Sequence, residues 1–323
     1  FFERQVPKLF RTLFMRKLYA WIVLLKIQHD YDIILMRHMT FDPFVLLFGW
    51  FIKNRITIHH SKEIEELKQI KRNWKGKFAS FLERITGFAN SRQVIGILGV
   101  TNEIAQFEVE HHKAKCPSMC YPNGIEVDDI NVLEDCRKKQ NIHIAFMCGT
   151  FTSWHGLDRL IDSAGKLNTR DINFQIYIHL IGRLAQEQKQ LIEQTDLDNI
   201  YFLCHGYMNV EDYTRILKKC DCGLGTLAID RKKLSEGSML KVREYLSYGI
   251  PVYSDCMDTS LPNDFIYYRK GNVDCQEIVS FAQEMKHVSR FEVRKASEEY
   301  IKLDNILKDV YIWLKESVLP IRR

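Results

Sequence analysis

Short runs of branched aliphatic residues alternate with longer amphipathic runs along almost the whole chain of 323 residues. Residues 94–100 and 142–148 are two such strand-type runs, and a helix-type pattern follows each of them. A strand, a helix and a second strand in this order form a parallel pair, because the helix carries the chain back across the sheet. The alternation therefore predicts an α/β fold, with parallel sheets covered by helices.

The expected elements form two series, and Pro122-Asn123-Gly124 is a turn between them, since proline and glycine interrupt both helices and strands. A chain of this length suits two domains of ~100–200 residues each. We expect domains at 1–122 and 123–300, followed by a C-terminal segment at 301–323. Strands are expected at 32–37, 55–58, 94–100, up to 121, 142–148, 174–181, 201–204, 222–224 and 251–253, and helices at 43–52, 74–88, after 101, 156–167, 186–194, 210–219, 238–248 and from 275 onward.

Composition excludes several classes of protein. Hydrophobic residues make up 46% of the chain, enough to form packed cores, which excludes a disordered protein. The nine cysteines include no Cys-x-x-Cys pair, so we expect free thiols in a reducing compartment and no zinc site built on cysteine. The apolar run at 44–52 is shorter than the ~20 residues of a spanning helix, and no signal pattern opens the sequence.

Positive charge is concentrated near the beginning of the sequence. Residues 1–120 hold 19 Lys and Arg against 11 Asp and Glu, which predicts an anionic partner such as lipid or phosphate. Within residues 1–26, apolar side chains recur at helical spacing among basic ones, a pattern typical of helices in a lipid interface. We expect a cytoplasmic protein held peripherally at the inner membrane face, although a core helix with a basic outer edge has the same pattern.

Residues 225–254 carry the densest pattern of chemically reactive side chains. Glu236 and Glu244 are separated by seven residues, and Gly237-Ser238 stands between them where a helix is expected to begin. The alternative interpretation is an exposed acid pair on an amphipathic helix.

The expected start of this helix is suited to a phosphate. If the helix begins near Ser238, backbone N–H groups around Met239 and Leu240 have no partner within the helix and attract anions. Lys241 lies in the first turn, where the helix dipole disfavours a cation unless an anion binds.

This segment resembles the donor site of retaining nucleotide-sugar glycosyltransferases of family 4, which have the two-domain GT-B fold. The resemblance rests on Glu236 and Glu244 at this spacing and on the small residue, glycine and proline that follow. Weaker similarity to the same family covers most of the chain. The matching residues are Tyr245, Leu246, Gly249, Pro251 and Val252, and the further stretches are 101–108, 121–129, 144–161 and 201–226.

The resemblance implies two Rossmann-like parallel-sheet domains facing a cleft, an acceptor domain first and a donor domain second, with the C-terminal helix returning to the first. It implies transfer of a sugar from a nucleoside diphosphate sugar to a glycan or lipid-linked acceptor with retention, as in surface polysaccharide biosynthesis. Neither a metal nor another cofactor is expected. Glu236 would contact the sugar hydroxyls, and Glu244 would contact the ribose. The diphosphate would be contacted by the turn from Ser238 to Lys241 together with Arg231 and Lys232.

Two features depart from the family pattern. Many members carry Arg and Lys in the first donor-domain loop, where this chain has Thr150 and His155 at the matching positions; Gly149, Thr150 and His155 are candidate donor-binding residues. The departing diphosphate still requires positive charge, and Arg231, Lys232 and Lys241 are the nearest cations in sequence, unless Arg231 and Lys232 belong to a solvated loop. The usual first strand and its glycine-rich loop are also missing or replaced.

His59 and His60 follow a strand at 55–58, and ligands of open α/β sheets bind at the carboxyl ends of strands. Similar proteins often hold a histidine there near the donor sugar, and we assign His60 as a candidate catalytic residue. A histidine bound to backbone at the strand end is the alternative.

Other functional classes are less well supported. The sequence has neither a Gly-x-Gly-x-x-Gly nor a Walker pattern, which argues against dehydrogenases and kinases, and no nucleic-acid-binding module is recognisable. Two alternatives to a glycosyltransferase stay open: a nucleotide-sugar epimerase on the same scaffold, and a non-catalytic subunit of similar shape that binds a partner enzyme.

Overall fold

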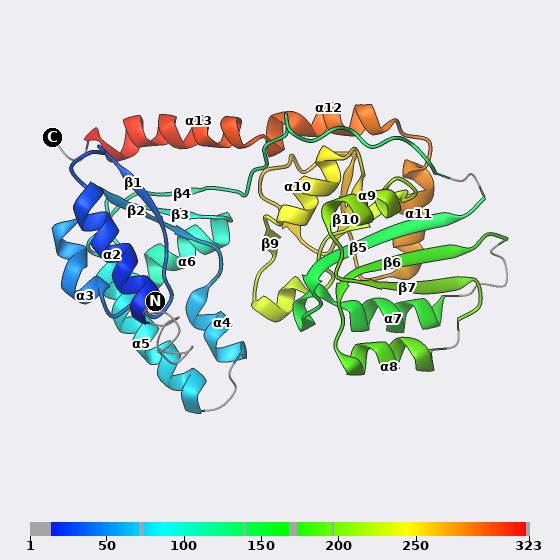
Figure 1. Ribbon diagram of the computed structural model, residues 1–323, viewed down its shortest axis with the longest axis horizontal. Helices are drawn as coiled ribbons and strands as arrows, with labels where there is room; N and C mark the ends of the chain where they lie inside the picture. Colours follow the sequence, from blue (N-terminus) through cyan, green and yellow to red (C-terminus); the bar gives the residue numbers. More distant parts are fainter. Residues whose placement is uncertain (1–13, 71–73, 138–139, 168–172, 196, 321–323) are drawn as a thin grey trace. The chain divides into compact units, whose positions relative to one another are not determined.

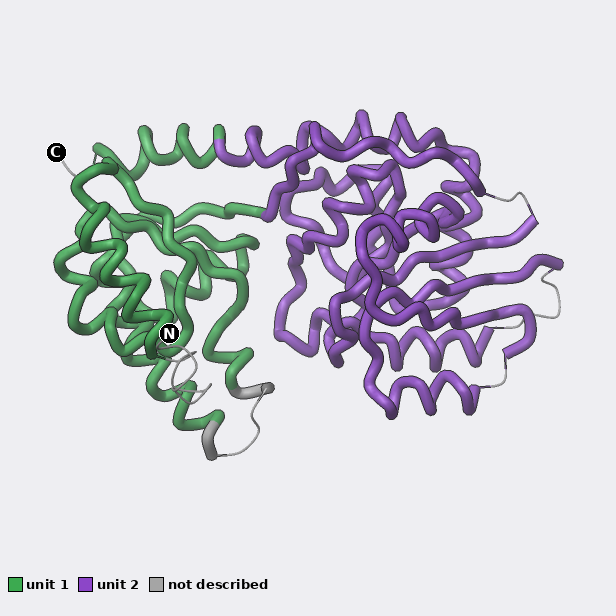
Figure 2. Tube along the Cα trace, in the orientation of Figure 1, with its two compact units in different colours: residues 1–122, 308–323 green, residues 123–307 purple. Residues whose placement is uncertain are grey.

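The computed structural model describes residues 14–320 except 71–73, 138–139, 168–172 and 196 (Figure 1). Its contacts divide the chain into two compact units: residues 1–122 with 308–323, and residues 123–307 (Figure 2). The first half of the predicted lipid-interface segment at 1–26, residues 1–13, lies outside the described residues, and α2 begins at Arg16 in its second half. In the part of the chain that is described, every helix is too short or too polar to span a bilayer.

The first unit is built on a four-stranded parallel sheet in which the strands lie in sequence order. The helices of this unit are 3 to 18 residues long. The strands are β1 (Ile34–Arg37), β2 (Arg55–His59), β3 (Gly96–Gly99) and β4 (Ser118–Cys120), and the helices are α2 (Arg16–Ile27), α3 (Val45–Phe48), η3 (Gly49–Phe51), α4 (Glu63–Ile70), α5 (Trp74–Ser91) and α6 (Asn102–His112).

The end of the chain completes this unit. Helix α13 (Leu303–Trp313) and the turn η6 (Leu314–Val318) place Val310 and Val318 in one buried cluster with Ile56 and Leu98 of the sheet. The C-terminal residues therefore supply part of the first unit's core.

The second unit has a doubly wound sheet of six parallel strands in the order β12-β10-β8-β5-β6-β7. The chain works outward from β5 to β7, then returns to β8 beside β5 and continues in the other direction. Strand order therefore reverses between β5 and β8. The strands are β5 (Ile142–Thr150), β6 (Ile176–Arg183), β7 (Ile200–Gly206), β8 (Cys222–Leu224), β10 (Val252–Ser254) and β12 (Tyr268–Lys270).

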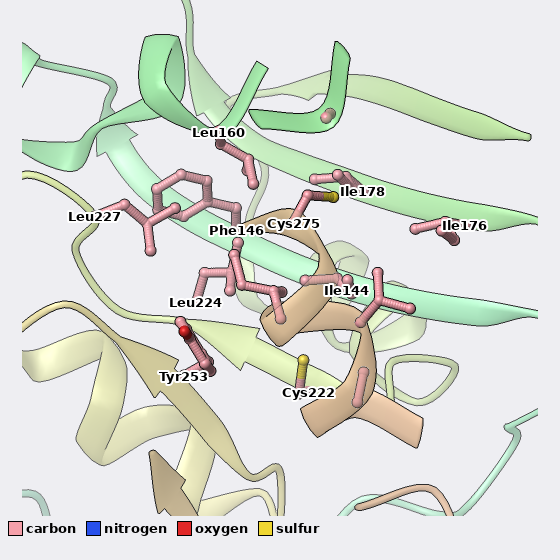
Figure 3. Close-up of a cluster of buried hydrophobic side chains, with 14 of the residues drawn as sticks. Ile144, Phe146, Leu160, Ile176, Ile178, Cys222, Leu224, Leu227, Tyr253 and Cys275 are labelled. Atoms are coloured by element: carbon pink, nitrogen blue, oxygen red, sulfur yellow. The ribbon is translucent and has the colours of Figure 1, made fainter. Parts of the chain in front are cut away.

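Helices cover both faces of this sheet. Residues of α7 and α11 pack with Ile144 and Phe146 on one face (Figure 3), and residues of α9, α10 and α12 pack with Ala145 and Met147 on the other. The central strand is thus buried on both sides, as parallel sheets require. The helices are α7 (Leu157–Lys166), α8 (Gln186–Gln194), α9 (Val210–Leu217), α10 (Leu240–Ser247), α11 (Cys275–Met285) and α12 (Arg290–Ile301).

Candidate functional site

The reversal of strand order between β5 and β8 is the place where doubly wound sheets bind ligands. The two strands pair only at Ile144 with Cys222 and at Ala145 with Gly223. Beyond these pairs, the Tyr245 hydroxyl of α10 is the hydrogen-bond partner of two backbone groups of β5. The Met147 N–H donates to this hydroxyl over 2.8 Å, and the hydroxyl donates to the Ala145 carbonyl over 3.2 Å. The carboxyl end of β5 is thereby separated from β8 and leads into a loop.

Gly223 allows this arrangement. A Cβ atom at this position would lie 2.6 Å from the ring of Tyr245, closer than packed atoms approach. The glycine therefore lets α10 come close to the sheet.

The loop after β5 and the loop after β8 bind each other. The first contains the turn η4 (Ser153–His155) and the second the turn η5 (Ile229–Lys232). The Leu227 N–H donates to the His155 carbonyl over 3.0 Å.

Two ion pairs run in opposite directions between the loop after β8 and the first turn of α7. Arg231 donates to Asp158 over 2.6 and 2.9 Å and to the Ser153 carbonyl over 2.6 Å. Arg159 donates to Asp230 over 2.7 and 2.8 Å. Arg231, expected from the sequence to contact a diphosphate, thus has a carboxylate partner and holds the loops together.

His155 is a neutral hydrogen-bond donor at this edge. Its Nδ1 accepts from the Thr152 N–H over 2.9 Å, which leaves the proton on Nε2. Burial, with Lys241 and Lys232 nearby, lowers the pKa of His155 to about 3. His155 therefore offers an N–H group without a charge at neutral pH.

Lys241 supplies a cation at the same edge. Its ammonium donates to Cys148 Sγ over 3.5 Å and lies 4.7 Å from the ring centroid of Phe146. Burial lowers the pKa of Lys241 below its ordinary value. Among the described residues, no carboxylate forms an ion pair with it; a thiol is its polar partner.

The remaining predicted residues of this edge are accessible. Gly149 and Thr150 are exposed at the end of β5, and a Cβ atom at Gly149 would meet nothing within 4 Å. The Lys232 ammonium lies 4.3 Å from the ring centroid of Trp154.

The segment at 236–238, just before α10, is held by strand pairing and by side-chain hydrogen bonds. Glu236 and Gly237 form the short strand β9, which pairs with β11 (Met257–Asp258). Ser238 is buried, and its hydroxyl accepts from the Asn123 N–H over 2.7 Å and from Arg243 over 3.1 Å.

The helix therefore begins at Leu240, two residues later than expected, with Met239 as its N-cap residue. The Ser238 side chain is committed to Asn123 and Arg243 and does not cap the helix. The expected contact of the turn at 238–241 with a diphosphate would therefore use backbone N–H groups, and the Ser238 hydroxyl already has partners.

Arg243 joins the segment to the rest of the unit. Its guanidinium donates to both oxygens of Asp258 over 2.8 Å and to the Asn123 carbonyl over 2.7 Å. Both side chains of the ion pair are 0% exposed.

Glu244 lies inside α10 and accepts a hydrogen bond from the Tyr213 hydroxyl of α9. Burial raises the pKa of Glu244. Glu236 is partly exposed on β9. The two carboxylates of the sequence motif thus lie on different elements, and Tyr213 is a neighbour of Glu244 that the sequence did not indicate.

A second polar cluster lies at the carboxyl edge of the first unit's sheet. His59, the last residue of β2, places Nδ1 3.3 Å from Glu63 Oε2 and 3.4 Å from Glu108 Oε2, and His112 Nε2 is 3.3 Å from the same Glu108 oxygen. Burial, with the neighbouring Glu63 carboxylate, raises the pKa of Glu108 to about 8. The sequence analysis did not predict this cluster. Glu108 and His112 are four residues apart on one helix, so their spacing alone could have indicated that the two side chains meet.

His60 follows β2 and is half-buried, outside this cluster. Burial and the nearby Arg37 lower the pKa of His60, so the ring is neutral at neutral pH. His60 belongs to the first unit, and the other predicted site residues belong to the second.

Comparisons with known proteins identify similar folds. No protein-family model matches the chain, and no curated sequence matches it. Sucrose-phosphate synthase from Thermosynechococcus elongatus is 12% identical over 96% of this chain and 80% of its own, with a TM-score of 0.63. Anabaena HepE, solved in complex with UDP-glucose, and WaaG, a glycosyltransferase involved in lipopolysaccharide biosynthesis, are each 14% identical over 91% of this chain and 81% of their own, with TM-scores of 0.58.

Similarity at this level of identity establishes the fold. Together with the two parallel sheets, it confirms the predicted fold class: this chain is an α/β protein of the GT-B type with two Rossmann-like domains.

Proposed function

We propose that this protein is a glycosyltransferase that transfers a sugar from a nucleoside diphosphate sugar to a glycan or lipid-linked acceptor. The observation that carries the proposal is the Lys241 ammonium, a partly buried cation that forms no ion pair with a carboxylate among the described residues, at the place where doubly wound sheets bind ligands. An unpaired buried charge is costly, and an anionic ligand would offset that cost. A nucleotide diphosphate has the required charge.

Several groups at this edge suit a diphosphate. Lys241 would supply positive charge, and the His155 Nε2–H would donate a neutral hydrogen bond. The amides of Met239 and Leu240, at the N-terminal end of α10, would donate further hydrogen bonds. Catalysis by such an enzyme consists largely of stabilising the departing diphosphate. Lys232 lies close enough to depress the pKa of His155 and would add to the positive potential.

The remaining roles follow the resemblance. Glu244 would accept ribose hydroxyls with the carboxylate oxygen that Tyr213 leaves available, and Glu236 would contact the hydroxyls of the sugar. His60, neutral at neutral pH, would exchange hydrogen bonds with the sugar at the reacting carbon. We further propose that the transfer retains the anomeric configuration and needs no metal, and that the enzyme acts in surface polysaccharide synthesis.

The test is nucleotide binding followed by product analysis. Titration calorimetry with a panel of nucleoside diphosphates is expected to identify a ligand of the full chain, and Lys241→Met is expected to weaken its binding tenfold or more. Lys189→Met, an exposed lysine on α8, is the matched control and should leave the affinity unchanged. Absence of binding by any nucleoside diphosphate would refute the proposal.

Product analysis separates the alternatives. Transfer of the sugar to an added acceptor would identify a glycosyltransferase. An isomerised donor would identify an epimerase, and binding of the donor without turnover would identify a non-catalytic subunit. The anomer found in the product by NMR tests retention.

We also propose that the acceptor is met at an anionic membrane surface. On α5, Phe78, Phe81, Ile85 and Phe88 form a stripe at spacings of three, four and three residues, each between 40% and 58% exposed. Arg92 stacks over Phe88, its guanidinium 4.5 Å from the ring centroid. An apolar stripe beside cations is typical of lipid-interface helices.

Co-sedimentation with vesicles tests the membrane proposal. Binding to anionic vesicles should exceed binding to neutral ones and should weaken with added salt. Phe81→Ser should reduce it; equal binding to both kinds of vesicle would contradict the proposal.

A further inference from the structure

The cluster of His59, Glu63 and Glu108 in the first unit joins three separate elements. His59 ends β2, Glu63 begins α4, and Glu108 lies in α6. Their side chains are 3%, 8% and 4% exposed. One nitrogen and two carboxylate oxygens therefore meet in a place that water scarcely reaches, and their ligand atoms all lie within 4.8 Å of one another.

The contacts of His59 in this cluster lie at the long end of hydrogen-bond distances. Charge-assisted N–H to carboxylate bonds are ~2.7–2.9 Å long, whereas His59 Nδ1 lies 3.3 and 3.4 Å from its two carboxylates. A tetrahedral ion with bonds of ~2.0–2.1 Å separates its ligand atoms by ~3.3 Å. The two observed separations match the edges of such a tetrahedron.

The two carboxylates also require a shared proton or a cation to offset their mutual repulsion. Among the described residues, no lysine or arginine pairs with Glu63 or Glu108; their ion-pair partners are His59 and His112. Two buried carboxylates that share one imidazole repel each other unless a proton or a metal ion lies between them.

A supporting layer of side chains orients the three groups. His59 Nε2 is 3.2 Å from the Thr57 hydroxyl, and with Nε2–H donating to that oxygen the Nδ1 lone pair faces the two carboxylates. His112 holds Glu108 from the other side over 3.3 Å. Metal-binding histidines and carboxylates are usually held by such outer partners.

We propose that His59, Glu63 and Glu108 bind one divalent transition-metal ion, with Zn²⁺ as the ion that the distances fit. Mixed imidazole and carboxylate ligands suit Zn²⁺ and its neighbours. The ion fastens the end of β2 to α4 and α6 and has a structural role. It is separate from the transfer reaction proposed above, for which no metal is expected, and it stands whether or not that function is correct.

The test uses Co²⁺ as a spectroscopic substitute for Zn²⁺ on the full chain after treatment with a chelator. Wild-type protein should bind one equivalent of Co²⁺ with the visible d–d bands of a tetrahedral site. No sulfur-to-cobalt charge-transfer band should accompany them, because the site contains no cysteine. Zn²⁺ should displace the Co²⁺ and abolish the bands.

Variants assign the ligands. Glu108→Gln and His59→Gln should each weaken Co²⁺ binding at least a hundredfold, whereas His111→Gln, which alters the neighbouring histidine on α6, should leave it unchanged. The wild-type spectrum decides the question even where a variant fails to fold. No bound Co²⁺ in the wild type, a sulfur band, or undiminished binding in both ligand variants would overturn the proposal.

Discussion

Burial determines the protonation state of His155, and this has a measurable consequence. The folded-state pKa is about 3 and the ordinary value is 6.5, so between these values the unfolded chain binds a proton that the folded chain does not. The free energy of unfolding should therefore fall as pH decreases below 6.5, by up to about 2 kcal/mol at pH 5 for this group.

His155→Asn removes this proton site, and the asparagine oxygen can still accept from the Thr152 N–H. Urea denaturation at pH 7 and pH 5 should show a smaller loss of stability in the variant than in the wild type. Identical pH dependence would show that the imidazole is protonated in the folded state as readily as in water.

The two glutamates should give different kinetic results. Glu244→Ala should weaken donor binding by about 1.5–3 kcal/mol per lost hydrogen bond, because a charged acceptor is removed. Tyr213→Phe is its matched control, since it removes the hydroxyl that contacts Glu244 and leaves the carboxylate. Unchanged nucleotide affinity in Glu244→Ala would rule out the ribose role.

Glu236→Gln should instead lower kcat far more than donor affinity. Contacts to the reacting sugar strengthen in the transition state, and their loss appears in turnover. Steady-state kinetics with a direct binding measurement separates the two effects; wild-type turnover would exclude the assignment.

Among the elements, the segment before α10 depends on a buried ion pair. Arg243→Met leaves the Asp258 carboxylate buried without its partner and should cost about 3–5 kcal/mol. Arg231→Met breaks the pair with Asp158, whose side chains are 30% and 50% exposed, and should cost about 0–1 kcal/mol.

Chemical denaturation of both variants measures the difference. The double variant Arg243→Met with Asp258→Leu should recover part of the loss, because no charge is then left buried. Equal costs for Arg243→Met and Arg231→Met would contradict this account.

For the whole molecule, residues 310–318 of the C-terminal segment contribute to the core of the first unit. Val310 is 2% exposed and packs in one cluster with Ile56 and Leu98. Val310→Ala should therefore lower the free energy of unfolding by about 1.5–3 kcal/mol. Val210 on α9 is 58% exposed, so Val210→Ala should change stability by about 0.5 kcal/mol or less.

Hydrogen exchange locates the effect. In Val310→Ala, the amides of β2 and β3 should exchange faster, and those of β5 and β6 should keep their wild-type rates. Faster exchange throughout the chain would mean that the two units unfold together.

The sequence alone determined the α/β class and most of the element order, because periodicity and turn residues are local properties. The strand at Cys222–Leu224 and the helix at Gln186–Gln194 have the expected bounds. Helix α4 was not expected, and the single helix expected at 43–52 is α3 followed by η3.

Only the tertiary structure decided how the candidate sites are built. Ser238, which was expected to open helix α10, instead bonds to Asn123, 115 residues earlier in the chain, and the helix begins at Leu240. Lys241 meets Cys148 across 93 residues, and Glu108 meets His59 across 49. A local pattern carries no information about contacts at such separations, which arise when parallel strands bring their carboxyl ends to one edge of a sheet.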